Sequence, residues 1–307
     1  MIKRAAVYRG FDKQHAEGIR AICAGLLLLM AVAAWAGPAT WDDVLVQTAG
    51  PADVTVSYGE HRDQFGELRW PPDAGPHPVV VVIHGGCWLP DFDLDHVRPL
   101  AEAITALGYV TWTIEYRRPA EYEDGWPETF MDAAAAVDHL RELADANDLD
   151  LDQITLLGHS AGGQLALWLA ARPDFGADHP LFEVQALPVT RVLALAPITD
   201  MADYASEASG CPAGARRVLG GAPDERPKRY RAVSPVENLP RAVRVDLVHA
   251  VADPIVPLEQ SERFVDLFKQ AGGDIDLHRI PDPAGHFELV LTQGGGWEQV
   301  QDFLKRP

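Results

Sequence analysis

Runs of apolar residues alternate with amphipathic segments along most of the chain. An uninterrupted β-branched run at 78–83 predicts a strand that is covered on both faces. Segments with helical periodicity follow several of the predicted strands, and the first two strands are expected to pair as a hairpin. The predicted strands are 53–58, 65–70, 78–83, 109–114, 154–157, 192–196, 243–250 and 275–280, and the predicted helices are 93–107, 127–146, 161–171, 258–271 and 296–305.

This alternation places the chain in the α/β class. Strands that alternate with helices of this length predict a mostly parallel central sheet with helices on both faces. Residues 198–242 contain no strand pattern and many Gly, Pro and charged residues, so we expect a small cap or lid insertion there. With no internal repeat and no low-complexity linker, residues 37–307 are predicted to form one domain.

The N-terminal segment has the pattern of a secretory signal. Residues 1–20 are rich in Lys and Arg, and the apolar run 21–35 leads into Ala34-Trp35-Ala36, an A-x-A cleavage signature. We therefore predict a signal peptide over 1–36, export to the periplasm or the medium, and no stable membrane partner after cleavage. An uncleaved anchor is the alternative, although the run is short for a membrane span of about 20 residues.

Composition narrows the functional classes. The chain has 307 residues, 47% of them hydrophobic, and a net charge of −19, which argues against nucleic-acid binding because no basic stripe is present. Beyond the predicted signal, Cys87 and Cys211 remain, and a disulfide or two free thiols are both compatible with the sequence. Neither cysteine has metal-ligand spacing, so no metal or cofactor is expected.

A G-x-S-x-G pattern is the strongest chemical signal. Gly158-His159-Ser160-Ala161-Gly162 lies between the predicted strand 154–157 and the predicted helix 161–171. A serine in such a tight turn exposes its hydroxyl at the positive end of the helix dipole. We therefore predict that Ser160 is a nucleophile; the alternative is an ordinary strand-to-helix turn.

A glycine-rich loop after the strand 78–83 predicts an oxyanion hole. In His84-Gly85-Gly86-Cys87-Trp88 the glycines allow backbone N–H groups to turn toward a developing oxyanion. We assign the two donors to Ala161 and to Gly86 or Cys87, and Trp88 is a candidate substrate-binding residue. The alternative is a plain glycine-rich turn.

Two further residues complete a candidate triad. His286 is in the loop after the last predicted strand, and Asp253 follows the strand 243–250, which gives the chain order Ser, acid, His. His286 would act as the base, and Asp253 would hold its tautomer. Asp253 could instead cap the following helix, and Asp200 is the second candidate for the acid. Tyr116 and Arg117 either brace the glycine-rich loop or form a surface turn.

The chain resembles the α/β-hydrolase superfamily over roughly residues 50–305. The resemblance is carried by the H-G-G-x-W loop and the G-H-S-A-G-G elbow. The chain is most similar to exported carboxylesterase-like members and to the kynurenine-formamidase-like branch. The resemblance implies Ser160, Asp253 and His286 as the triad and a small-molecule ester or amide as the substrate. We expect an ester hydrolase; the alternatives are an amide hydrolase (an arylformamidase or an exopeptidase) and an inactive binding or scaffold protein.

Overall fold

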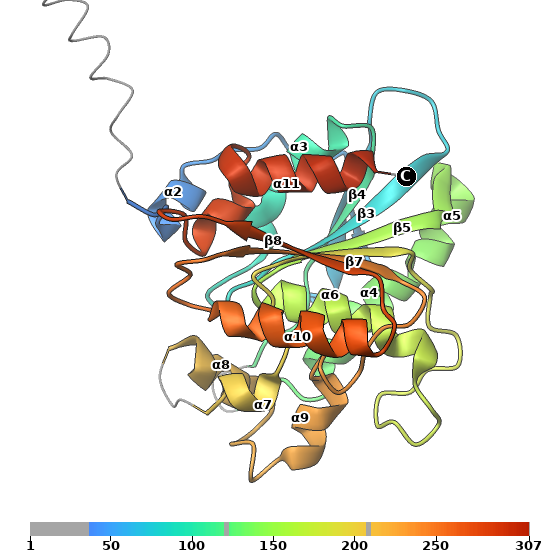
Figure 1. The fold of residues 1–307 in the computed structure, drawn as a ribbon. Helices are drawn as coiled ribbons and strands as arrows, with labels where there is room; N and C mark the ends of the chain where they lie inside the picture. Colours follow the sequence, from blue (N-terminus) through green and yellow to red (C-terminus); the bar gives the residue numbers. More distant parts are fainter. Residues whose placement is uncertain (1–36, 120–122, 207–209, 307) are drawn as a thin grey trace, which may run out of the picture. The chain divides into compact units, whose positions relative to one another are not determined.

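A mixed sheet organises the part of the chain that the computed structural model describes, residues 37–119, 123–206 and 210–306 (Figure 1). These residues form eight strands in the order β1-β2-β4-β3-β5-β6-β7-β8. The predicted signal peptide lies outside the described residues. The strands are β1 (Val54–Ser57), β2 (Phe65–Arg69), β3 (His77–Ile83), β4 (Val110–Ile114), β5 (Leu149–His159), β6 (Arg191–Leu195), β7 (Arg244–Ala250) and β8 (Ile275–Ile280).

The pairing of the strands confirms the predicted sheet. β1 and β2 form the expected antiparallel hairpin, and β2 also pairs antiparallel with β4. All pairs from β4 through β3, β5, β6 and β7 to β8 are parallel. The carboxyl ends of the parallel strands therefore meet at one edge of the sheet, which is where such folds place their chemistry.

Helices cover both faces of this sheet, as Figure 1 shows for α6 and α10 on one face and α11 on the other. The alternating side chains of β3 explain the two layers. Val79, Val81 and Ile83 belong to one buried cluster, and Val80 and Val82 belong to the other. The helices are α2 (Trp41–Leu45), α3 (Arg98–Thr105), α4 (Glu128–Asp138), α5 (Leu140–Asn147), α6 (Ala161–Ala171), α10 (Leu258–Gln270) and α11 (Gly294–Lys305).

Residues 127–146 form two helices where the periodicity predicts one. α4 and α5 flank His139, whose backbone angles (φ −64°, ψ −16°) stay in the right-handed helical region. α5 is followed by Asp148 in the left-handed conformation (φ 51°), which ends the helix. The segment is therefore helical as expected, but it is divided at His139.

The segment between β6 and β7, which we call the cap, carries three short helices and no strand within its described residues, 198–206 and 210–242. α9 contacts α6, because the indole of Trp168 donates to the carbonyl of Ala232 at 3.0 Å. In the described ranges, no helix is both long and apolar enough to cross a membrane. The cap helices are α7 (Met201–Tyr204), α8 (Cys211–Val218) and α9 (Pro227–Val233).

Trp112 on β4 offers a test of the larger core cluster. Its indole is fully buried and donates to the carbonyl of Ala136 at 2.9 Å. Trp112→Ala is expected to lower the free energy of unfolding by about 3–5 kcal/mol, since a large cavity replaces the ring. Urea unfolding measures this loss. The control is Met131→Ala, at a side chain that is 54% exposed, which should change the free energy of unfolding by less than about 0.5 kcal/mol. Equal effects of the two substitutions would contradict the placement of Trp112 in the core.

Candidate active site

Ser160 occupies a strained turn between β5 and α6. Its backbone angles are φ 56° and ψ −118°, a region that residues with a side chain rarely adopt. The Ser160 N–H donates to the carbonyl of Leu195 on β6 at 2.8 Å, so the turn is fixed to the neighbouring strand. This is the geometry expected of a nucleophile elbow.

The flanking glycines allow this turn by close backbone contact. A Cβ at Gly158 would lie 2.1 Å from the carbonyl oxygen of Gly162, and a Cβ at Gly162 would lie 2.2 Å from that of Ile83 on β3. Any side chain at either position would push α6 away from the sheet. The G-x-S-x-G pattern is therefore a packing requirement as well as a chemical signal.

The oxyanion loop, His84–Trp88, lies beside Ser160. A Cβ at Gly85 would be 3.1 Å from the Cβ of Ser160. Gly86 (φ 102°), Cys87 (φ 56°) and Trp88 (φ 55°) all have left-handed backbone angles, so the chain turns sharply after β3. Ala161 begins α6, and amides of a first helical turn have no carbonyl partner within the helix. The assignment of Gly86, Cys87 and Ala161 as oxyanion donors stays a prediction.

Buried polar groups hold the start of this loop. The Tyr116 hydroxyl donates to the carbonyl of His84 at 2.8 Å, and the two rings stack with centroids 4.3 Å apart. Of the two alternatives, Tyr116 therefore braces the loop. The Arg117 guanidinium does not contact the loop in this way and pairs with Asp132 at 2.7 Å.

Glu115 and Arg118 also support the loop, and the sequence reasoning missed both. The Glu115 carboxylate accepts from His84 Nε2 at 2.9 Å and pairs with Arg118. Burial raises the pKa of Glu115, but the His84 ring and the Arg118 guanidinium outweigh it and lower the pKa to about 2. A carboxylate at the end of a fully buried strand is the sequence signal that could have found this support.

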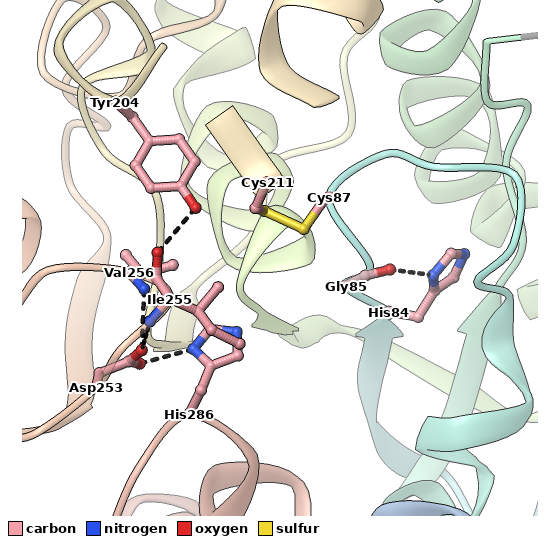
Figure 2. Close-up of a disulfide and its surroundings, with 9 residues drawn as sticks. All are labelled: His84, Gly85, Cys87, Tyr204, Cys211, Asp253, Ile255, Val256 and His286. Atoms are coloured by element: carbon pink, nitrogen blue, oxygen red, sulfur yellow. Dashed lines mark hydrogen bonds and ion pairs between the residues drawn. A yellow bond between two sulfur atoms is a disulfide. The ribbon is translucent and has the colours of Figure 1, made fainter. Parts of the chain in front are cut away.

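His286 and Asp253 meet at the end of the sheet. The His286 Nδ1 lies 2.6 Å from Asp253 Oδ2, and both side chains are almost completely buried (Figure 2). Asp253 Oδ1 also accepts from the backbone N–H groups of Ile255 and Val256, at 2.8 and 2.9 Å. Burial raises the pKa of Asp253, yet the hydrogen bond with His286 and those from the two backbone N–H groups lower the pKa below its usual range. An ionised acceptor on Nδ1 leaves Nε2 of a neutral His286 without a proton.

The hydrogen-bond and ion-pair partners of Asp200 and Asp253 show which of the two carboxylates contacts His286. Asp200 accepts from the N–H groups of Ala202 and Asp203 and pairs with Arg263 at 2.6 Å, so it caps α7. Asp253 does not cap α10, which begins after Pro257 without a side-chain cap. The partner of His286 is therefore Asp253.

Two buried histidines tie the loops of the site together. His159 Nε2 donates to the carbonyl of His286 at 3.1 Å, with the ring centroids 4.5 Å apart. His249 Nε2 donates to the carbonyl of Val256 at 2.9 Å, behind the Asp253 loop. Because carbonyl oxygens only accept, Nε2 carries the proton in both rings. Burial lowers the pKa of each ring, which favours the neutral form that these contacts use.

Cys87 and Cys211 form a disulfide, which decides between the two states that the sequence left open (Figure 2). Cys211 also lines a cavity of about 580 Å³ with Tyr204 of the cap and Ile255 of the Asp253 loop. Trp88 is fully buried in the larger core cluster, and its proposed role in substrate binding stays a prediction. In the described ranges, no group of three His, Cys, Asp or Glu residues could hold a metal ion.

Comparisons with known sequences identify a family and related esterases. The BD-FAE family model matches residues 68–268. Two proteins of Mycobacterium tuberculosis are similar: the probable carboxylic ester hydrolase LipM is 28% identical over 78% of the chain, and esterase LipQ is 28% identical over 81%. The chain spans 55% of the length of LipM and 61% of that of LipQ.

Solved structures share the fold. Esterase B from Lactobacillus rhamnosis, in a structure with a tributyrin phosphonate, superposes with a TM-score of 0.72 at 19% identity and covers 96% of this chain and 94% of its own. Esterase Est2 from Thermogutta terrifontis gives 0.63 at 23% identity, covering 83% of this chain and 92% of its own. These similarities confirm the expected α/β-hydrolase fold.

The elbow glycines give a direct test of the packing. Gly158→Ala is expected to destabilise the protein by at least about 1–3 kcal/mol, because the added methyl group meets the backbone of Gly162. Chemical denaturation measures the loss. The matched control is Gly295→Ala in α11, where a Cβ would be 3.5 Å from its nearest neighbour and the change should be neutral or slightly stabilising. A Gly158→Ala protein as stable as the Gly295→Ala protein would refute the packing argument.

The Asp253 carboxylate predicts a pH-dependent stability difference. Because its pKa is lowered in the folded protein, its stabilising contribution is present above the ordinary aspartate pKa of about 4 and is lost as the pH falls through the folded value. Asp253→Asn should therefore be less stable than the original protein at pH 7, and the difference should shrink below about pH 4. Urea unfolding across this range measures it; a difference that grows on acidification would contradict the assignment.

Proposed function

Because the chain belongs to the BD-FAE family, we propose that it is a serine hydrolase that cleaves carboxylic esters of small molecules. The observation that carries the proposal is the buried hydrogen bond between His286 and Asp253, at 2.6 Å, at the same sheet edge as the strained Ser160. The names of the relatives, a probable carboxylic ester hydrolase and several esterases, support ester cleavage.

The proposed reaction begins with attack of the Ser160 Oγ on the ester carbonyl. His286 Nε2 takes the serine proton, and Asp253 stabilises the resulting imidazolium through Nδ1–H. The carbonyl oxygen becomes an oxyanion that accepts from the N–H of Ala161 and from that of Gly86 or Cys87. Asp253 needs no hydrogen bond from water, because two backbone N–H groups already donate to its second carboxylate oxygen.

The tetrahedral intermediate then collapses to an acyl-enzyme. The C–O bond to the leaving group breaks, and His286 returns the proton to the departing alcohol. A water molecule next gives a proton to His286 and attacks the acyl carbon. The C–O bond to Ser160 then breaks and His286 returns the proton to the Ser160 Oγ, which releases the carboxylic acid and restores both residues. His286 must begin each half-reaction neutral, so that its Nε2 can accept a proton.

Export belongs to the same proposal. The signal peptide predicted over 1–36 supports export of the enzyme to the periplasm or the medium. The Cys87–Cys211 disulfide supports an oxidising compartment, because such bonds persist mainly outside the cytosol. The substrate would then be an ester met outside the cytoplasm.

Replacement of the nucleophile tests the activity. Ser160→Ala is expected to lower kcat for p-nitrophenyl acetate by about 10⁴-fold or more, because no other group takes over the attack. It should also abolish covalent labelling by a fluorophosphonate. Ser206→Ala, at an exposed serine of the cap, is the matched control and should leave both unchanged.

Two outcomes would contradict the proposal: turnover by Ser160→Ala within tenfold of the original rate, or no turnover of esters by the original protein. A parallel panel of methyl ferulate, N-formylkynurenine and a dipeptide anilide decides between ester and amide cleavage. We expect the highest kcat/KM on an ester, and a higher value on either amide would overturn the ester assignment.

A further inference from the structure

We infer that the Cys87–Cys211 disulfide is a positioning element of the active site, because it ties the oxyanion loop to the cap helix α8 and holds the amide of Cys87, one of the two candidate donors from this loop, in place for the oxyanion. The inference rests on the proposed function. It adds a role for two residues outside the triad, one of them in the cap. The argument depends on how the loop is strained, what touches it and what anchors α8.

The backbone of the oxyanion loop is strained and depends on contacts with its neighbours to keep its conformation. Three consecutive residues, Gly86, Cys87 and Trp88, have φ between 55° and 102°. Only glycine adopts this region readily, so Cys87 and Trp88 relax toward ordinary angles unless neighbours prevent it. The Leu89 N–H donates to the carbonyl of Gly86 at 2.9 Å, and this hydrogen bond closes the turn. It does not involve Cys87, whose conformation must be stabilised by other contacts.

The cap helix α8 supplies two of those contacts. Cys211, its first residue, forms the disulfide, and Gly214 lies one turn further along. A Cβ at Gly214 would be 2.3 Å from the carbonyl oxygen of Cys87, so the α8 backbone lies directly against that peptide. Positions three apart share one helix face, so both contacts press on the same residue from the same side.

α8 is itself firmly held, which makes it a fixed point. Arg216 donates to the carbonyl of Ala205 at 2.7 Å, and the carbonyl of Val218 accepts from the Gly125 N–H at 3.1 Å. The side chains of Val218 and Leu219 are fully buried. Tyr116 holds the other end of the loop through the His84 carbonyl.

The disulfide therefore fixes the end of the loop that carries the proposed donor. Figure 2 shows it between the His84–Gly85 segment and the His286–Asp253 pair. A cross-link that only stabilised the fold would change the unfolding temperature and leave the folded enzyme equally active. A cross-link that places the Cys87 N–H changes transition-state stabilisation instead.

The test compares the intact enzyme with Cys211→Ser and with the Cys87→Ser/Cys211→Ser double variant, at a temperature where circular dichroism shows each to be folded. We expect kcat for p-nitrophenyl acetate to fall about 10- to 100-fold with KM within about threefold, somewhat less than the cost of deleting an oxyanion donor. Cys211→Ser leaves the Cys87 side chain in place, so it isolates the cross-link.

A trifluoromethyl ketone inhibitor provides the readout that a purely structural role would not move. Ser160 Oγ bonds to the ketone carbon, its proton passes to His286, and the C=O electron pair becomes an oxyanion in the hole. Its Ki should rise by the same factor by which kcat/KM falls. In a folded variant, an unchanged kcat and an unchanged Ki would overturn the inference.

A second variant leaves the disulfide intact. Gly214→Ala adds a methyl group that meets the Cys87 carbonyl and forces α8 and the loop apart, so it should lower kcat and weaken binding of the ketone in parallel. The control Ala213→Ser, at a half-exposed position of α8, should do neither. If the cysteine variants fail to fold, an unchanged Ki in Gly214→Ala overturns the inference. Absence of Ser160-dependent turnover in the original enzyme would instead refute the proposed function.

Discussion

The close approach of α6 to the sheet is the constraint on which the rest of the site depends. Every residue of α6 is buried, and the helix starts within van der Waals contact of β3 and β5 because Gly158 and Gly162 carry no side chains. This contact leaves the chain one residue, Ser160, in which to turn from strand to helix. The strain at that residue, of the order of 1–3 kcal/mol, is offset by the burial of a whole helix.

The remaining groups reach Ser160 through buried polar contacts between loops. His159 links the elbow to the carbonyl of His286, and His249 holds the segment that presents Asp253. Burial lowers the pKa of both rings, so they act as neutral, fixed hydrogen-bond donors. In this arrangement His159, the sequence neighbour of Ser160, also supports His286.

The sequence predicts the parts of this site that depend on local pattern. Strand patterns predict a strand at each of the eight places where the described residues form one, although β5 (Leu149–His159) extends beyond the predicted 154–157. The motif order places Asp253 and His286 after β7 and β8, where the structure brings them together. Contacts that no motif specifies stay open or undetected, because spacing says nothing about distance in the fold. The sequence leaves the Cys87–Cys211 disulfide as one of two alternatives, and it does not indicate the support of His84 by Glu115.

The cap illustrates how such contacts decide between a mobile lid and a fixed wall. Its helices touch each of the three active-site segments: Tyr204 donates to the carbonyl of Ile255, Cys211 is bonded to Cys87, and the carbonyl of Val233 accepts from Gln164 on α6. Opening the cap as one body would break all three links, one of them covalent. These contacts favour a cap that shapes the site permanently, so that ligand selection depends on the fit to a preformed site rather than on closure around the ligand.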